Sequence, residues 1–269
     1  MFGAALVIIG NELLDGYVRD ENGPALLARL RMRGIEVQEV SIVPDRVEVI
    51  AQTVLRLTRD DGCRWVMTVG GVGPTPDDVT YAGVAQAFGL SLTTSPRIIE
   101  WIEQWCPSLN RAEARDAMCR MARVPAGSRL VLPEQLAGPV VALDVRQDAD
   151  HTDCTIVMLP GDPALVQQVM DDGVESELFA GITTRTSSCD ITHNLPEALL
   201  VPVFELVRKR GPGVQIGSYP GQPMIIRLTG EEARLCELRQ EIMVVVRGLE
   251  AQMMGTHRSP PRNSVLGAI

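Results

Sequence analysis

Over the first part of the chain, short runs of consecutive apolar residues alternate with stretches in which apolar residues recur every three or four positions. The runs, such as Ala4–Ile9 and Trp65–Val69, predict strands buried on both faces, because a strand with one solvated face alternates apolar and polar residues. The periodic stretches predict helices with one apolar face, and Pro24 suits the first position of one of them. Strands that alternate with helices predict an α/β fold over residues 1–180, with a three-layer, mostly parallel sheet.

The same patterns place each predicted element of this region. Strands are expected at Ala4–Ile9, Ile35–Val43, Trp65–Val69, Arg129–Leu132, Val140–Leu143 and Thr155–Leu159. Helices are expected from Pro24 to Gly34, from Asp45 to Gly62, at 80–88, at Pro96–Trp105, at Arg111–Arg120 and from Pro163 to Leu178. Asp45 with Glu48 forms a capping-box-like start for the second of these helices.

The pattern changes after Gly181, where a second unit is predicted. Its order is strand, helix, strand, strand, helix, with elements at Thr183–Ile191, Pro196–Arg208, Val214–Ser218, Ile225–Leu228 and Glu231–Gly248. This order predicts a small α+β lobe over residues 181–250. Residues 251–269 contain Pro260 and Pro261 and no periodic apolar pattern, which predicts a disordered tail.

Composition and charge restrict the classes of function. The formal net charge is −9 and aromatic residues make up 4% of the chain. The acidic balance argues against a nucleic-acid partner, and the few aromatics argue against a stacking platform for single strands. No apolar run reaches the roughly 18 residues of a membrane span, so no membrane partner is expected. The six cysteines include no C-x-x-C pair, which predicts reduced thiols and a cytoplasmic location.

Two polar loops follow buried strands and are the candidates for a functional site. The first is residues 10–16 (GNELLDG), after the first strand, and the second is residues 70–80 (GGVGPTPDDVT), after the third strand. Ligands of open parallel sheets bind outside the carboxyl ends of the strands. If the strand order is 2-1-3, both loops meet at one crevice, and Glu12 faces the glycine loop there.

The glycine loop has the composition of a phosphate site with a cation. Three glycines within four residues let the backbone approach a ligand and expose N–H groups, and a nearby helix start favours an anion. The candidate contacts with the phosphate are the three glycines and the hydroxyls of two threonines: Gly70, Gly71, Gly73, Thr75 and Thr80. Asp77 and Asp78 are unusual partners for an anion unless a hard divalent cation lies between them. The loop therefore predicts a phosphorylated small-molecule ligand with Mg, Mn or Co.

A purely structural interpretation stays open for each of these residues. The glycine loop is equally compatible with a tight strand-to-helix turn, in which Asp77 or Asp78 only caps the helix. Glu12 is compatible with a solvated loop acid, and Asp45 with a simple N-cap. The remaining polar turn residues are compatible with turn formation alone: Asp20, Asn22 and the segment Leu159–Pro163.

Together these motifs resemble the MoaB/Mog-type molybdopterin-binding fold family. The similar segments are Gly10–Gly16, Asp20–Asn22 (a D-x-N motif), Val43–Asp45 and, most specifically, 70–80. The chain resembles in particular the branch shared by the N-terminal part of CinA-type proteins and the molybdopterin-binding-like domain of FAD synthases. Two further segments are similar to features of that branch: Asn110–Pro125 and Ile216–Pro220. The resemblance extends from Ala4 to Gly248, and it departs from the family pattern at Asn11, usually an acid, at Val69, usually threonine, and at Asp162, usually apolar.

The resemblance implies a stand-alone version of this domain, because neither the second CinA domain nor an adenylyltransferase domain is found. It implies catalytic and metal-binding roles for Glu12, Asp77 and Asp78, with further ligand contacts at Gly10, Asn11, Asp45 and the glycine loop. The first expected activity is divalent-metal-dependent hydrolysis of an adenine-containing diphosphate such as FAD or ADP-ribose. The alternatives are molybdopterin binding or adenylylation in molybdenum cofactor biosynthesis, and a non-catalytic nucleotide- or pterin-binding module. The sequence leaves a homo-oligomer open.

Overall fold

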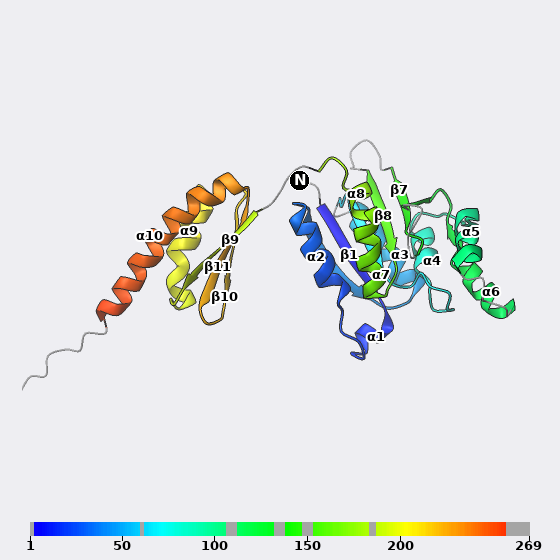
Figure 1. Ribbon diagram of the computed structural model, residues 1–269, viewed down its shortest axis with the longest axis horizontal. Coiled ribbons are helices and arrows are strands. Elements are labelled where there is room, and N and C mark those ends of the chain that lie inside the picture. The colour runs from blue at the N-terminus through cyan, green and yellow to red at the C-terminus, as the bar shows by residue number, and fades with distance from the viewer. Residues whose placement is uncertain are drawn as a thin grey trace, which may run out of the picture. The chain divides into compact units, whose positions relative to one another are not determined.

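A computed structural model describes residues 3–59, 62–105, 112–131, 138–146, 153–182 and 187–256 of the chain (Figure 1). The chain divides into two compact units, Met1–Thr183 and Thr184–Ile269.

The first unit is built on a six-stranded sheet with the order β2-β1-β3-β8-β7-β6. The strands are β1 (Gly3–Ile9), β2 (Glu36–Val43), β3 (Trp65–Val69), β6 (Arg129–Leu130), β7 (Val141–Val145) and β8 (Cys154–Leu159). Strands β2, β1, β3 and β8 pair in parallel, whereas β7 runs antiparallel to β8 and to β6. The predicted mostly parallel sheet is therefore confirmed, with an antiparallel edge, and the strands have the 2-1-3 order that would bring the two polar loops together.

Helices cover both faces of this sheet, as Figure 1 shows. They are α1 (Asn11–Leu14), α2 (Asn22–Met32), α3 (Val47–Arg59), α4 (Thr80–Ala87), α5 (Pro96–Trp105), α6 (Ala112–Arg120), α7 (Pro163–Val169) and α8 (Glu175–Leu178). A π-helical turn, Met170–Val174, joins α7 to α8, and a short antiparallel pair, β4 (Leu92–Thr94) and β5 (Arg123–Pro125), flanks α5 and α6.

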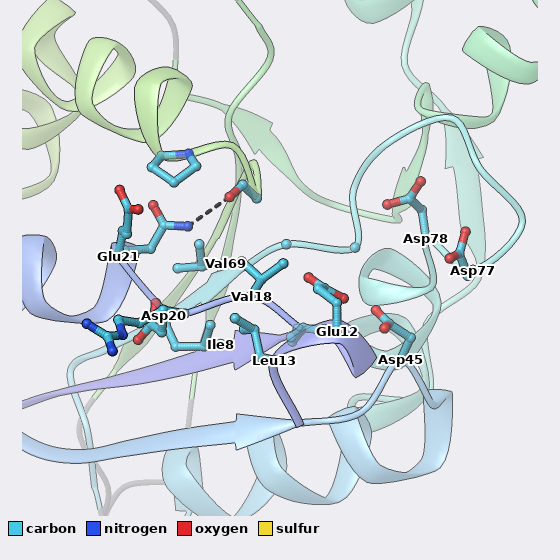
Figure 2. Close-up of a pocket in the computed structure, with 18 residues that line it drawn as sticks. Ile8, Glu12, Leu13, Val18, Asp20, Glu21, Asp45, Val69, Asp77 and Asp78 are labelled. Atoms are coloured by element: carbon cyan, nitrogen blue, oxygen red, sulfur yellow. Dashed lines mark hydrogen bonds between the residues drawn. The ribbon is translucent and has the colours of Figure 1, made fainter. Parts of the chain in front are cut away.

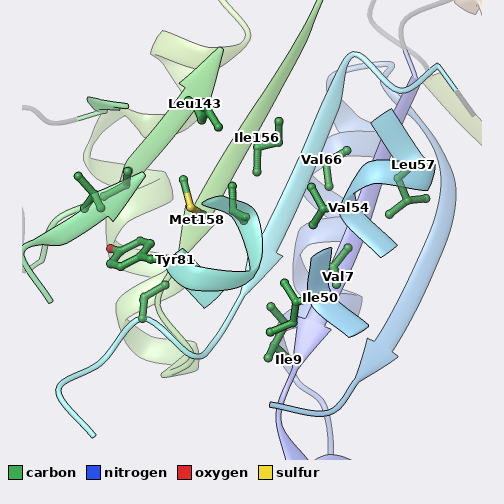
Figure 3. Close-up of a cluster of buried hydrophobic side chains, with 14 of the residues drawn as sticks. Val7, Ile9, Ile50, Val54, Leu57, Val66, Tyr81, Leu143, Ile156 and Met158 are labelled. Atoms are coloured by element: carbon green, nitrogen blue, oxygen red, sulfur yellow. The ribbon is translucent and has the colours of Figure 1, made fainter. Parts of the chain in front are cut away.

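Two apolar cores lie on opposite faces of the sheet. Successive residues of β1 point to opposite faces, so Leu6 packs with Leu26 of α2 in one core and Val7 packs with Ile50 of α3 in the other. Figure 3 shows the second core, with Tyr81 of α4 beside the sheet. This double burial explains why β1 is a continuous apolar run without alternation.

Several local predictions about this unit are wrong in detail. Residues 11–14 form the helical turn α1 where a loop is expected, and α2 begins at Asn22, two residues before Pro24. Helix α3 begins at Val47, two residues after the expected start at Asp45, and the carboxylate of Asp45 accepts a hydrogen bond from the backbone N–H of Asn11 (2.8 Å). The helix expected from Pro163 to Leu178 is broken at Gly173, whose φ of 131° is not helical.

The second unit has a three-stranded antiparallel sheet in the order β10-β11-β9, with two helices on it. Its elements are β9 (Ser187–His193), a 3-10 turn (Glu197–Leu200), α9 (Val201–Arg210), β10 (Gln215–Tyr219), β11 (Met224–Gly230) and α10 (Glu232–Thr256). Residues such as Val203, Ile226 and Ile242 form a separate core. The strand–helix–strand–strand–helix order is that predicted for the lobe.

The ends of this unit differ from the prediction. Helix α10 continues to Thr256, so residues 251–256 are not a disordered tail, because Leu249 and Met253 keep the helical spacing and pack against the core. Residues 257–269, and residues 183–186 of the predicted first strand, lie outside the described residues.

Two further observations concern the whole of the described structure. Within it, no helix has both the length and the apolar character that crossing a bilayer requires. The five cysteines that it describes are free thiols: Cys63, Cys119, Cys154, Cys189 and Cys236.

Candidate functional site

A pocket of about 280 Å³ opens at the carboxyl ends of the parallel strands (Figure 2). Its walls come from the segments that follow β1, β2, β3 and β8, together with the start of α2. This is the edge of an open parallel sheet where ligands bind. The structure thus brings the two loops at 10–16 and 70–80 to one crevice, as the strand order predicts.

Four carboxylates gather at one end of this pocket. Figure 2 shows Glu12, Asp45, Asp77 and Asp78 together there, whereas Asp20 and Glu21 lie at the other end; we refer to the first four as the acidic end. Within the described residues, Arg19 is the single basic side chain among those that line the pocket. A phosphate entering the acidic end would therefore meet unfavourable charge unless a cation entered with it.

The charges of the acidic end act on one another. Burial raises the pKa of Asp45 above its usual value, and the nearby negative charges of Glu12 and Asp77 raise it further, while the N–H of Asn11 lowers it. Glu12 and Asp77 are thus each close enough to Asp45 to repel its charge. The arrangement stores unfavourable electrostatic free energy that a bound cation would release.

The donor set at the acidic end suits a hard divalent cation. Carboxylate oxygens are the ligands that Mg²⁺ and Mn²⁺ prefer. Among the described residues, however, no three acidic, histidine or cysteine side chains converge as a ready metal cage. Mg²⁺ commonly uses one or two carboxylates together with water and substrate phosphates. The residues therefore fit a cation shared with a phosphorylated ligand, and the roles of Glu12, Asp77 and Asp78 as its ligands stay predictions.

Asp77 and Asp78 do not cap helix α4. The N-cap of α4 is Val79, which makes no side-chain capping bond. The Oδ2 atom of Asp78 accepts from the backbone N–H of Thr75 (2.7 Å), and the Thr75 hydroxyl lies 2.6 Å from Asp78 Oδ2 and 2.5 Å from Asp77 Oδ1. The Thr75 hydroxyl is the main cause of a lowered pKa at Asp77. The interpretation of these two residues as helix caps is therefore wrong.

The glycines at the start of the loop are required by the backbone. Gly70 and Gly71 have φ values of 97° and 65°, which L side chains rarely adopt. A Cβ atom on Gly70 would clash with the carbonyl oxygen of Ile9, and one on Gly71 with the hydroxyl of Thr80. The close approach of this loop to β1 thus depends on glycine at both positions.

Thr80 supports the loop from beneath. Its side chain is fully buried, its hydroxyl donates to the carbonyl of Gly70 (2.8 Å), and its backbone N–H donates to the carbonyl of Gly71 (2.9 Å). Thr80 does not line the pocket, and neither do Gly73, Thr75 or Asn11. This placement favours a supporting role for Thr80 over the predicted contact with a ligand.

Several backbone N–H groups expected to bind phosphate already have partners within the protein. The N–H of Gly10 donates to Val43 and that of Gly70 donates to Leu159, each at 3.1 Å, which extends the sheet. The N–H of Asn11 is taken by Asp45. Of the glycines that line the pocket in the 70–80 loop, Gly71 has no acceptor for its N–H within the described structure. The predicted backbone cradle is therefore reduced to the region of Gly71.

The structure adds residues that the sequence interpretation treated as structural. Asn22 is buried, and its Nδ2 donates to the carbonyl of Gly161 (2.8 Å), which joins the start of α2 to the turn after β8. Both residues line the pocket, as does Pro163. Two signals pointed to them: the D-x-N motif at 20–22, and a glycine turn following another parallel strand at the same sheet edge.

An apolar middle separates the two ends of the pocket. In Figure 2, Ile8, Leu13, Val18 and Val69 lie between the acidic end and Asp20. Val18 is 53% exposed and comes from the segment between α1 and α2. Such a surface suits the face of a flat heterocycle, with polar groups at both of its ends.

The fold and this pocket define an α/β domain with a pocket at the carboxyl ends of a parallel sheet. Residues 5–180 match the family described as a probable molybdopterin binding domain. The match covers well over half of the chain, and the chain belongs to this MoaB/Mog-type family.

Several proteins are similar to the chain over most of its length. A protein from Aeropyrum pernix is 30% identical over 249 residues, which is 89% of each chain. A CinA-like protein from Citrifermentans bemidjiense is 30% identical over 88% of this chain, and a probable FAD synthase from Caenorhabditis elegans is 30% identical over 81%. The chain spans 58% and 43% of the length of these last two proteins.

A solved structure supports the fold. The protein CinA with unknown function from Thermoplasma acidophilum superposes with a TM-score of 0.55 at 22% identity, over 65% of this chain and 97% of that one. The resemblance to the branch that contains CinA-type proteins and FAD synthases is thus confirmed.

Proposed function

We propose that the chain is a divalent-metal-dependent pyrophosphatase acting on an adenine-containing diphosphate such as FAD or ADP-ribose. The observation that carries this proposal is the gathering of four carboxylates beside the glycine loop at the sheet edge. The presence of CinA-like proteins and probable FAD synthases among the relatives favours this substrate class.

Each part of the pocket takes one part of such a ligand. The N–H of Gly71 donates to a phosphate oxygen, and the apolar middle takes the face of the heterocycle. Asp77 and Asp78 hold the cation, with Glu12 as a further ligand or as the base that accepts a proton from water. The cation supplies neutralisation of phosphate charge and activation of water.

The reaction is a hydrolysis that needs no further reactant. The oxygen of water forms a bond to one phosphorus, and the bond from that phosphorus to the bridging oxygen breaks. The products are AMP and the second monophosphate, which is FMN when the substrate is FAD. The acidic end keeps this chemistry dependent on a cation, since the carboxylates alone repel a diphosphate.

Molybdopterin binding or adenylylation is the second candidate function. It is favoured by the family description, which names molybdopterin, and by the acceptor-rich far end of the pocket, where Asp20 and Glu21 could accept from the N–H groups of a pterin. An adenylyltransferase would consume ATP, whereas a binding module would retain its ligand without turnover.

A screen of substrates against metals separates these functions. The chain is incubated with FAD, ADP-ribose, NAD or ATP, each with Mg²⁺, Mn²⁺ or Co²⁺ or with a chelator, and the products are separated by chromatography. The proposal expects AMP from FAD or ADP-ribose only when metal is present. No release of AMP from any diphosphate in any metal would contradict it and favour the second candidate.

A further inference from the structure

Arg120 lies outside the pocket but contacts the loop that carries two of its acids. Its Nε and Nη2 atoms both donate to the carbonyl oxygen of Pro74, at 3.1 and 2.8 Å. Pro74 stands between the glycines that begin the loop and the segment with Asp77 and Asp78. The guanidinium group therefore holds the outer part of the loop by a forked, charge-assisted contact.

The loop makes few other hydrogen bonds to the rest of the first unit, although Val72 is buried in the core of the sheet. At its base, Thr80 bonds the carbonyls of Gly70 and Gly71. At its tip, the hydrogen bonds of Thr75 run to Asp77 and Asp78, so they shape the tip without attaching it to another element. The Arg120 contact is thus the hydrogen-bonded link from the described tip to a distant part of the chain.

The backbone that carries Arg120 is itself well anchored. Arg120 is the last residue of α6, and the following Ala122 is fully buried. The carbonyl of Ala122 accepts from the N–H of Ser95 (2.8 Å), which precedes α5. Because the backbone of Arg120 is fixed at the end of α6, its side chain fixes the Pro74 carbonyl relative to this helix.

We infer that Arg120 is a positioning residue, which sets the distance of Asp77 and Asp78 from Glu12 and Asp45 across the acidic end. This inference rests on the proposed function and deepens it. The carboxylates on the loop tip and those beside β1 come from different segments, so they can share one cation only if the tip is held in place. Residues that orient metal ligands from outside typically change metal affinity or activity 10–100-fold when they are removed.

The test compares Arg120→Met, Arg120→Lys and Arg123→Met in the full chain. Methionine keeps an apolar side chain and removes the hydrogen-bond donors. Lysine keeps the positive charge and a donor, but its ammonium group lacks the planar fork of the guanidinium. Arg123 on β5 is an exposed arginine three positions away that has no ion pair or side-chain hydrogen bond in the described structure, so it controls for loss of surface charge.

The first readout is the kinetics of AMP release from FAD or ADP-ribose at varied Mn²⁺. In Arg120→Met we expect kcat to fall, and the half-activating metal concentration to rise, by about 10-fold or more, with KM for the diphosphate changed far less. Arg120→Lys should recover part of both effects, and Arg123→Met should match the wild type. A lowered melting temperature with unchanged kcat and metal dependence would overturn the inference, since it would leave Arg120 only a structural role.

The second readout does not need activity. Hydrogen exchange of the amides at 72–79 should quicken in Arg120→Met and stay unchanged in Arg123→Met. Equal protection of these amides from exchange in all variants would contradict the inference that Arg120 holds the loop. If the wild type releases no AMP from any diphosphate, the proposed function fails, while hydrogen exchange still decides whether Arg120 holds the loop.

Discussion

At the scale of single residues, Asp45 shows how the charges of the pocket act on one another, because burial and neighbouring carboxylates shift its pKa. Burial and the charges of Glu12 and Asp77 raise its pKa above the ordinary value of 3.8. A raised pKa means that the folded state binds a proton more tightly than the unfolded state. Ionised Asp45 therefore costs stability, and this cost grows as pH rises through the raised pKa.

Replacing Asp45 by asparagine tests whether the ionised carboxylate lowers the stability of the fold. The amide oxygen can still accept from the N–H of Asn11, but the charge is gone. Without added metal, we expect Asp45→Asn to be at least as stable as the wild type at pH 7, and to lose its relative advantage as pH falls to about 4, where the unfolded aspartate also protonates. Thermal unfolding between pH 3.5 and pH 8 measures this. A stability difference that does not vary with pH would argue against the repulsion.

Thr80 offers a second test on a single residue. Thr80→Val removes the hydroxyl that donates to the buried carbonyl of Gly70 while keeping the shape of the side chain. A buried acceptor left unpaired costs about 1–3 kcal/mol. Urea unfolding should therefore show Thr80→Val to be less stable by about this amount, with Thr80→Ser close to the wild type. Equal stability of the two variants would mean that the loop does not depend on this bond.

At the scale of elements, β1 and β3 were predictable because each is a continuous, fully buried run. The predicted strand Trp65–Val69 has the same first and last residues as β3. All of its side chains are buried, so the apolar run ends where the strand ends. The direction of β7 was not predictable, because its sequence (VALDV) is compatible with either direction and its antiparallel pairing with β8 is a non-local choice.

The same limit applies to the pocket. Glu12, Gly71 and Asp77 were predicted to share a crevice because each follows a strand at one edge of the sheet. The bond from Asn22 to Gly161 joins residues 139 positions apart, and a turn-forming residue type gives no sign of such a partner. Sequence patterns thus predict which loops meet but not which side chains within them are already bonded to protein.

Helix α7 gives a prediction at this scale. Asp162, where the family resemblance expects an apolar residue, is its N-cap and accepts from the N–H of Leu165 (3.0 Å). Asp162→Ala should lower the free energy of unfolding by about 1 kcal/mol, whereas Asp162→Asn should have little effect, because asparagine caps as well as aspartate. Chemical denaturation of both variants decides this. An alanine variant as stable as the asparagine variant would exclude the cap as the reason for Asp162.

At the scale of the whole molecule, each of the two units has a core of its own. We expect residues 1–183 to fold without the second unit, because the described apolar side chains of the sheet form two cores with helices of the first unit. The shortened chain should show a cooperative thermal transition by circular dichroism. A broad, non-cooperative transition would indicate that the first unit needs the lobe to fold.

Ser218 and Tyr219 belong to the segment Ile216–Pro220, which resembles a feature of the CinA branch, and both lie in β10 of the second unit. Within that unit, the guanidinium carbon of Arg227 lies over the ring of Tyr219, 5.4 Å from the ring centroid.

The central claim is that the acidic end of the pocket binds a cation for diphosphate hydrolysis, and Asp77→Asn tests it most directly. Asp77 is exposed, and asparagine can still accept from the Thr75 hydroxyl, so folding should not depend on the change. We predict that metal-dependent release of AMP from FAD and ADP-ribose is lost in Asp77→Asn, and in the matched variants Asp78→Asn and Glu12→Gln, while the melting temperature changes little. If all three variants release AMP at the wild-type rate in every metal, the metal site is not at these carboxylates.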